Sequence, residues 1–193
     1  MTPHSSPHPT PRPTALNPPV PVAPRSRPDW RFMLAHPAHI LALGFGCGLS
    51  RVAPGTVGTL FAWLAFAALA PLLGSAVWGS VLGASALVGW WACTVTARNL
   101  ALSDPGAIVW DEVLGFWIVL WLLTPASGWA QAAAFLLFRF FDAAKPGPVA
   151  WADQLWKGRQ SEPIGWAQGF GILFDDLVAA LCTLLVIAIW RVL

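Results

Sequence analysis

Long apolar segments dominate this chain and limit what it can fold into. They cover residues 40–49, 57–73, 76–97, 108–123, 129–141 and 173–190. Of the 193 residues, 56% are hydrophobic and 10% are charged, whereas about a quarter of the residues in a soluble domain are charged. At about 1.5 Å of rise per residue, the longer segments can cross a hydrocarbon core of about 30 Å. The sequence therefore predicts an all-α, integral membrane helical bundle of about four to five apolar helices.

The shorter segments leave part of this layout open. Residues 40–49 are rich in glycine and too short to span, which indicates an interfacial or re-entrant piece. Residues 108–123 and 129–141 flank an uncharged turn at residues 124–128. They either cross the membrane or form a shallow hairpin, and hydropathy alone does not decide between these alternatives.

The N-terminal segment has a different composition. Residues 1–29 hold ten of the eighteen prolines and almost no large apolar residue. Such a segment cannot bury enough surface to offset its ordering entropy. We therefore expect residues 1–29 to form a disordered Pro-rich tail, partly in the polyproline II conformation. Residues 30–193 are expected to form one membrane-embedded domain.

The charged residues indicate how the segments are threaded. Arg25, Arg27 and Arg31 precede all the apolar segments, so the positive-inside rule places the N-terminus in the cytoplasm. Threading five segments from there brings the acidic clusters to the cytoplasmic ends. The uncharged turns at residues 71–75 and 124–128 then fall on the far side. The few basic residues form no stripe for nucleic acid, so no nucleic-acid partner is expected.

Five of the nine acidic residues lie in or beside the apolar segments. They are Asp111, Glu112, Asp142, Asp175 and Asp176. A carboxylate against hydrocarbon costs several kcal/mol unless a cation compensates it. All four histidines lie at or before His39, and oxygen-only ligands suit Mg²⁺ or Mn²⁺. The acidic residues therefore predict a divalent-cation site.

Each acidic cluster also has a structural explanation. Asp104-Pro105 resembles an N-cap followed by a first-turn proline. Asp111–Glu112 and Asp175–Asp176 could be first-turn acids favoured by helix dipoles. Arg139, Asp142 and Lys145 recur every three residues, a spacing that permits ion pairs on one helix face. Whole-chain alternatives are a cation or proton pathway through intramembrane carboxylates and a purely structural membrane subunit.

A glycine-rich stretch could hold a phosphate group. Residues 44–50 run into residues 53–59, where glycines expose backbone N–H groups before a predicted helix. The positive end of that helix would point at the loop, which makes a workable phosphate cradle. The stretch is not a P-loop, because no Gly-Lys-Ser/Thr follows the glycines.

Four sequence blocks, taken in order, resemble one known family. They are Gly44-Phe45-Gly46 through Pro54-Gly55-Thr56-Val57-Gly58-Thr59; Asp104-Pro105-Gly106-Ala107-Ile108-Val109-Trp110-Asp111-Glu112-Val113-Leu114-Gly115; Phe138-Arg139-Phe140-Phe141-Asp142-Ala143-Ala144-Lys145-Pro146; and Gly171-Ile172-Leu173-Phe174-Asp175-Asp176-Leu177-Val178-Ala179. Each block is moderately specific alone, and the four in order are similar to the phosphatidylglycerophosphatase A family of bacterial lipid phosphatases. The resemblance covers about residues 37–190.

The resemblance implies an activity and a location. It implies Mg²⁺-dependent hydrolysis of the terminal phosphate of phosphatidylglycerophosphate, a membrane phospholipid, to give phosphatidylglycerol. It also implies the bacterial cytoplasmic (inner) membrane, with the active site facing the cytoplasm. The direct nucleophile stays open between a metal-bound water and a carboxylate, and no oligomeric state is predicted.

The resemblance also assigns roles to individual residues. As metal ligands and catalytic acid–base groups it implies Asp111, Glu112, Asp142, Asp175 and Asp176. For the substrate phosphate it implies Gly55, Thr56, Arg139 and Lys145. Ala180 departs from the family pattern, which has glycine there, and this puts only local packing in doubt. Arg51 and the Pro-rich tail lie outside the pattern.

Overall fold

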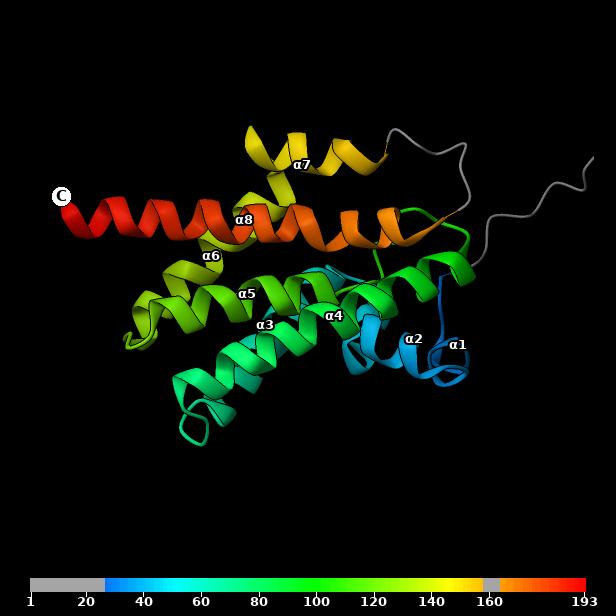
Figure 1. Cartoon of the computed structure of the whole chain (residues 1–193), viewed down its shortest axis with the longest axis horizontal. Coiled ribbons are helices and arrows are strands. Elements are labelled where there is room, and N and C mark those ends of the chain that lie inside the picture. Colours follow the sequence, from blue (N-terminus) through cyan, green and yellow to red (C-terminus); the bar gives the residue numbers. More distant parts are fainter. Residues whose placement is uncertain (1–26, 158–163) are drawn as a thin grey trace, which may run out of the picture.

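The computed structural model describes residues 27–157 and 164–193, which are helical and contain no strand (Figure 1). The elements are α1 (Trp30–Leu34), α2 (Pro37–Ala42), the 3₁₀ helix η1 (Gly44–Leu49), α3 (Pro54–Leu69), α4 (Ser75–Leu100), α5 (Trp110–Leu123), α6 (Gly128–Ala144), α7 (Pro148–Lys157) and α8 (Trp166–Val192). The all-α prediction is confirmed.

The last helix begins earlier than its hydropathy indicated. The apolar segment starts at residue 173, but α8 starts at Trp166. At this end the side chain of Gln168 accepts a hydrogen bond of 2.8 Å from the backbone N–H of Gly165. Glycines at 169 and 171 interrupt the apolar pattern, yet they lie where neighbouring elements approach α8 closely.

Helix α7 was not predicted from the sequence. It is amphipathic, with Val149 and Ala152 fully buried while Trp151 is exposed. Its apolar side packs on α8, and Figure 1 shows α7 beside that helix. It has only 10 residues and includes Asp153, Gln154 and Lys157, so a search for long apolar segments passes over it.

Helix α5 lies at the centre of the bundle. It packs against α8, α3 and α4, and most of its side chains are buried. Helices α4, α5 and α8 run side by side along the long axis of the molecule, with α1 and α2 at one end (Figure 1). Because every acidic cluster borders α5 or α8, this central pair positions the site.

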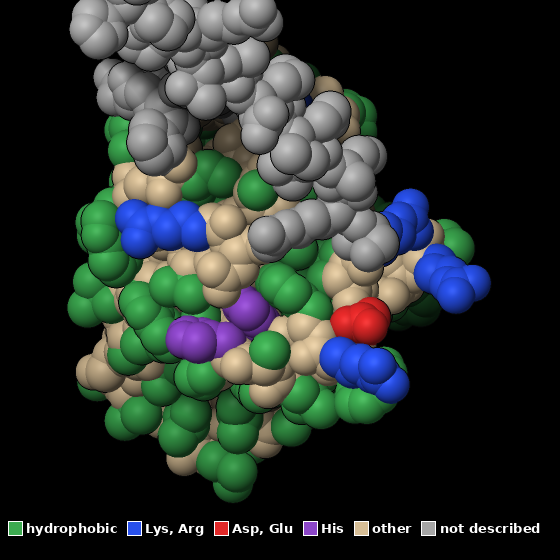
Figure 2. Space-filling view, turned by 90° about the vertical axis from the view of Figure 1, so that its right-hand side faces the viewer, with side chains coloured by type: hydrophobic (Ala, Val, Ile, Leu, Met, Phe, Trp, Pro, Cys, Tyr) green, Lys and Arg blue, Asp and Glu red, His purple; other side chains and the backbone are tan. Residues whose placement is uncertain are grey.

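The two uncharged turns lie at one end of the molecule. Figure 1 shows the α3–α4 and α5–α6 connections together near the C-terminus of α8. The opposite end carries α1 and α2, and Figure 2 shows cationic and histidine side chains there among hydrophobic ones.

Two of the described helices, α4 and α8, are long and apolar enough to cross a membrane by length and composition. Only 28% and 39% of their most apolar windows are buried inside the molecule. Most residues of these two windows are therefore at least partly exposed. Helices α3, α5 and α6 are shorter, with 16, 14 and 17 residues.

Part of the segment predicted as a tail contacts the folded chain. The carboxylate of Asp29 accepts a hydrogen bond of 2.8 Å from the backbone N–H of Phe32 and caps α1. The guanidinium of Arg27 donates to the backbone carbonyl of Arg51 at 3.3 Å. Residues 1–26 of the predicted tail lie outside the described residues.

The close packing of α8 on α4 gives a test of the fold. A Cβ added at Gly169 would lie 2.9 Å from Thr94 Cα and 1.8 Å from Thr94 Oγ1. We expect Gly169→Ala to reduce the free energy of unfolding by about 1–3 kcal/mol, as overpacking does. Thermal unfolding in detergent, followed by circular dichroism, measures this change.

Gly83→Ala is the matched control, because a Cβ there meets nothing within 4 Å. Alanine in a helix is favoured over glycine by up to about 1 kcal/mol, so this variant should be as stable as the parent or more stable. Equal melting temperatures for the two variants would contradict the α4–α8 contact.

Candidate active site

The ends of α5 and α6 and an inner turn of α8 bring the acidic clusters together. Asp111 and Glu112 lie in the first turn of α5, and Asp142 lies in the last turn of α6. Asp175 and Asp176 lie well inside α8, on the part that packs against α5 and α6. The helix-dipole explanation thus fits Asp111 and Glu112 but does not fit the Asp175–Asp176 pair.

Asp104 does not cap a helix. Helix α5 begins at Trp110, and its N-cap residue is Val109. Residues 101–109 form an irregular connection with a turn in which the N–H of Ile108 donates to the carbonyl of Pro105 at 2.9 Å. The capping explanation for Asp104-Pro105 is therefore wrong, because α5 starts five residues later than an N-cap at Asp104 requires.

One group of charges is centred on Lys145. Its ammonium donates to the carboxylates of Asp153 on α7 and Asp175 on α8. Burial disfavours the charged form of Lys145, but the two carboxylates outweigh this effect and hold the pKa of the ammonium well above its ordinary value. The stabilisation from this shift is fully present below the ordinary pKa of about 10.4 and is lost only in stronger alkali. Lys145 therefore stays charged at any physiological pH.

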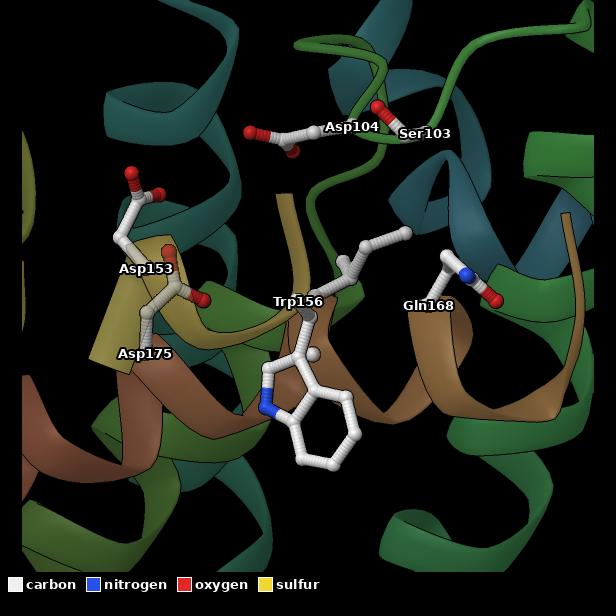
Figure 3. A pocket seen from close by; sticks show the side chains of 8 residues that line it. Ser103, Asp104, Asp153, Trp156, Gln168 and Asp175 are labelled. Atoms are coloured by element: carbon white, nitrogen blue, oxygen red, sulfur yellow. The ribbon is translucent and has the colours of Figure 1, made fainter. Parts of the chain in front are cut away.

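A small polar pocket lies beside this group (Figure 3). It has a volume of about 20 Å³, and Asp104, Asp153, Asp175, Ser103 and Gln168 are among the residues that line it. In Figure 3 the three carboxylates surround one space. About one water molecule fits such a volume, so the pocket is too small for a phosphate ester.

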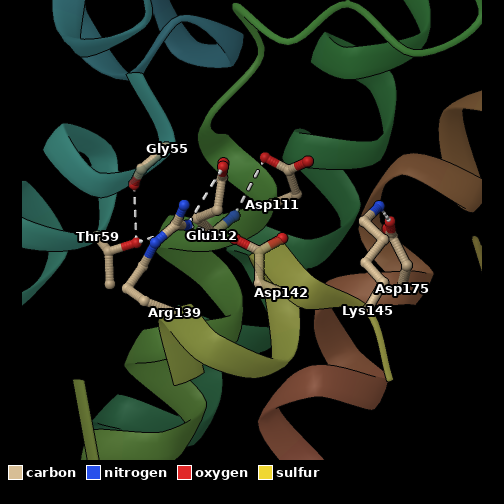
Figure 4. Close-up of polar contacts among 8 residues, drawn as sticks. All are labelled: Gly55, Thr59, Asp111, Glu112, Arg139, Asp142, Lys145 and Asp175. Carbon is tan, nitrogen blue, oxygen red and sulfur yellow. Dashed lines mark hydrogen bonds and ion pairs between the residues drawn. The ribbon is translucent and has the colours of Figure 1, made fainter. Parts of the chain in front are cut away.

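A second group contains the residues best placed to hold a cation. Each of Asp111, Glu112 and Asp176 offers a carboxylate oxygen, and the three oxygens lie within 4.8 Å of one another. Asp176 is buried, and the other two side chains are half-buried. Figure 4 shows Asp111 and Glu112 beside Asp142, with the Lys145–Asp175 pair apart from them. Of the five predicted carboxylates, three therefore converge on one point and Asp175 faces a different partner.

Arg139 links Asp142 to this group. Its guanidinium forms an ion pair with Asp142, and its Nη1 lies 3.7 Å from Glu112 Oε1. The same nitrogen donates to the hydroxyl of Thr59 at 3.4 Å, and that hydroxyl donates to the carbonyl of Gly55 at 2.8 Å (Figure 4). The ion-pair explanation thus holds for Arg139 and Asp142, while Lys145 pairs with other residues.

The first turn of α3 lies against this guanidinium. A Cβ added at Gly55 would lie 2.1 Å from Glu112 Oε1 and 3.1 Å from both terminal nitrogens of Arg139. Glycine is therefore required at position 55 by the close approach of two functional side chains. Thr56, the next residue of this turn, is half-buried.

Three polar atoms of this site are buried without a hydrogen-bond partner in the part of the chain that the structure describes. They are Glu112 Oε2, Asp176 Oδ2 and Arg139 Nε. An unpaired buried polar atom costs about 1–3 kcal/mol. Two unpaired acceptors and one unpaired donor at one place are suited to a cation and an anion bound together.

Sequence reasoning missed two residues of the site. Asp153 was passed over because it lies on α7, whose composition resembles a solvated helix. Thr59 lies within a quoted block, but its contact with Arg139 joins residues 80 positions apart. The amphipathic pattern of residues 148–157 is the one signal that could have pointed to Asp153.

The chain is similar to known proteins over most of its length. The model of the phosphatidylglycerophosphatase A family matches residues 40–191. The chain is 39% identical over 150 residues to phosphatidylglycerophosphatase A of Escherichia coli strain K12, covering 77% of this chain and 80% of that protein. The chain belongs to the phosphatidylglycerophosphatase A family. It is therefore a phosphatase.

Two further relatives support this membership. The phosphatidylglycerophosphatase A of Haemophilus influenzae is 36% identical over 162 residues, covering 84% of this chain and 93% of that protein. A Bacteroides thetaiotaomicron protein named as a candidate phosphatidylinositol-3-phosphatase is 33% identical over 160 residues, with coverages of 79% and 92%. No solved structure matches the chain.

The different partners of Arg139 and Lys145 give a second prediction. Because Arg139 has an unpaired Nε, we expect Arg139→Lys to weaken inhibition by inorganic phosphate about tenfold, the loss of one charge-assisted contact. Lys145 already contacts two carboxylates, so Lys145→Ala should leave this inhibition constant within about twofold while lowering kcat. Initial rates at several phosphate concentrations measure both values.

If Lys145 binds the substrate phosphate, as the sequence predicts, the opposite order of effects is expected. In that case Lys145→Ala would weaken phosphate inhibition at least as much as Arg139→Lys. An Asp142→Ala substitution that rescued Arg139→Ala would likewise show that the two side chains only neutralise each other.

Proposed function

We propose that this chain hydrolyses the terminal phosphate monoester of phosphatidylglycerophosphate to give phosphatidylglycerol and phosphate, in a reaction that depends on Mg²⁺. The proposal extends to this chain the activity named for its Escherichia coli and Haemophilus influenzae relatives. The observation that carries it is the group of unpaired acceptors and an unpaired donor at Glu112, Asp176 and Arg139.

The donor set suits the proposed cation. Asp111, Glu112 and Asp176 would hold Mg²⁺ through oxygen atoms, with no imidazole or thiolate required. With bonds of about 2.1 Å, an octahedral ion places its ligands up to about 4.2 Å apart. The present spacing of up to 4.8 Å needs only small side-chain rotations to fit. When bound, the ion would neutralise charge on the phosphoryl oxygens and lower the pKa of water.

The surrounding residues would position the phosphate. Arg139 Nε, unpaired in the described chain, would donate to a phosphate oxygen. The ion pair with Asp142 and the hydrogen bond to Thr59 hold the guanidinium in place for this contact. The first turn of α3, with Gly55 and Thr56, adds backbone N–H groups and the positive end of a helix. Lys145 and Asp153 would orient Asp175, the carboxylate that remains available for proton transfer.

The distribution of acidic residues supports a site at one membrane interface. No Asp or Glu occurs in residues 54–100, 113–141 or 177–193. Residues 177–192 of α8 extend about 24 Å at 1.5 Å per residue, which is about four-fifths of a hydrocarbon core of about 30 Å. We propose that this apolar half is embedded in the bacterial cytoplasmic membrane and that the carboxylates face the cytoplasm.

The same distribution disfavours a cation or proton pathway. A relay across the bilayer needs ionisable groups at several depths, whereas the apolar half contains no carboxylate. Proton flux into liposomes that contain the protein tests this alternative. We expect flux equal to that of empty liposomes.

Phosphate release from phosphatidylglycerophosphate in mixed micelles tests the proposed function. We expect turnover with Mg²⁺, loss of turnover with a chelator and recovery when Mg²⁺ is restored. Asp176→Asn should lower kcat by more than a hundredfold, beyond the roughly 10–100-fold typical of outer-shell partners. It should not unfold the chain, because it removes a buried charge.

Asp29→Asn is the matched control. Asp29 is an exposed carboxylate whose N-capping role asparagine can keep, so its kcat should stay within about twofold of the parent value. Phosphatidylinositol 3-phosphate serves as the competing substrate, because it is the lipid named for the Bacteroides relative. Chelator-resistant turnover, or Asp176→Asn activity within about threefold of the parent, would contradict the proposal.

A further inference from the structure

A cavity that the sequence analysis did not assign lies beside the candidate active site. It has a volume of about 370 Å³, which lies in the range of about 300–1,000 Å³ of ligand sites. Its walls come from the segment before α3, the end of α4, the connection that follows it, and residues 27–28. Arg51, which matched no family block, is one of its lining residues.

The charge of this cavity is opposite to that of the carboxylate site. Arg27 and Arg51 are its charged lining residues, and no carboxylate lines it. Neither guanidinium forms an ion pair within the described ranges 27–157 and 164–193. The hydrogen bond from Arg27 to the backbone carbonyl of Arg51 joins the two residues on one wall. The cavity is therefore suited to an anion.

Two segments of the chain lead from the cavity to the carboxylate site. Pro54 lines the cavity, and the next residue, Gly55, lies against Glu112 and Arg139. Ala107 also lines the cavity, and the same connection leads within four residues to Asp111. This adjacency is what a ligand with one anionic group in each place requires.

The remaining lining favours a lipid over a free inorganic anion. Leu49, Leu100 and Leu102 line the cavity beside the two arginines, and Leu102 is 51% exposed. An anion attached to a glycerol backbone would satisfy the guanidinium groups and cover these apolar side chains. Inorganic phosphate would leave them in contact with water.

We propose that this cavity binds the phosphodiester of the phospholipid substrate through Arg51 and Arg27, while the terminal phosphate lies at the carboxylate site. The proposal rests on the proposed function, because phosphatidylglycerophosphate carries a phosphodiester and a phosphomonoester separated by one glycerol unit. The cavity then selects lipids whose head group carries two phosphates separated by one glycerol unit. It binds the product too, since phosphatidylglycerol retains the phosphodiester.

Kinetics of charge-removing variants test this assignment. Arg51→Gln should raise KM for phosphatidylglycerophosphate about tenfold, as loss of one charge-assisted contact does, with kcat within about twofold. Arg51→Lys should recover part of the loss, because an ammonium keeps the charge without the planar fork. Arg31→Gln is the matched control: Arg31 is an exposed arginine of α1 that stacks on Trp30 and does not line the cavity.

Soluble inhibitors distinguish the two possible sources of the anion. Glycerophosphoglycerol, which carries the phosphodiester without acyl chains, should inhibit the parent and lose about tenfold in potency against Arg51→Gln. Inorganic phosphate should inhibit both proteins equally, because it binds at the carboxylate site. An Arg51→Gln variant with unchanged KM, or one that changes only kcat, would overturn the assignment. Equal effects of Arg51→Gln and Arg31→Gln would overturn it as well.

A binding measurement separates this assignment from the proposed function. Equilibrium binding of glycerophosphoglycerol to the detergent-solubilised full chain needs no turnover. If the chain released no phosphate from phosphatidylglycerophosphate, the proposed function would fail, while Arg51-dependent binding would still support an anion site. Binding that does not depend on Arg51 would reject the cavity even in an active enzyme.

Discussion

The repulsion among buried carboxylates is the constraint on which the rest of the structure depends. Asp111, Glu112 and Asp176 bring three acceptor oxygens within 4.8 Å of one another, and Arg139 is the cation nearest to Glu112. Two of these carboxylates keep an unpaired buried oxygen in the described chain. A fold that holds such a group without a bound cation pays a large desolvation and repulsion cost. We propose that a bound cation offsets this cost.

Several local contacts position the side chains around these three carboxylates. Gly55 allows the first turn of α3 to approach Glu112 and Arg139. Thr59 connects that turn to the guanidinium, and Asp142 fixes the guanidinium from the other side. Lys145 pairs with Asp153 and Asp175, whereas Asp176 lies with Asp111 and Glu112, so two adjacent acids of one helix have different partners. The contacts of Thr59 with Arg139 and of Lys145 with Asp175 join helices that are distant in sequence.

Much of the fold and of the site could be predicted from the sequence. Apolar segments of sufficient length locate α3, α4, α5, α6 and most of α8, because hydropathy and helix length are local properties. The cost of placing charge in apolar surroundings singled out five carboxylates, and three of them, Asp111, Glu112 and Asp176, converge. The start of α8 and the whole of α7 were missed, because their glycines and polar residues are explained only by contacts with α4 and α8. The partners of Lys145 could not be predicted, since Asp153 reaches it through tertiary packing.

We propose that Asp111, Glu112 and Asp176 hold one divalent cation. Mn²⁺ substitutes for Mg²⁺ at oxygen-only sites, and its electron paramagnetic resonance signal reports the bound ion directly. The measurement is the binding of Mn²⁺ to the purified full chain in detergent, compared with Asp111→Asn, Asp176→Asn and the control Asp29→Asn. The account predicts saturable binding that Mg²⁺ displaces, that the control retains, and that both site variants weaken at least about tenfold. Equal binding by all four proteins, or no saturable binding by the parent chain, would contradict it.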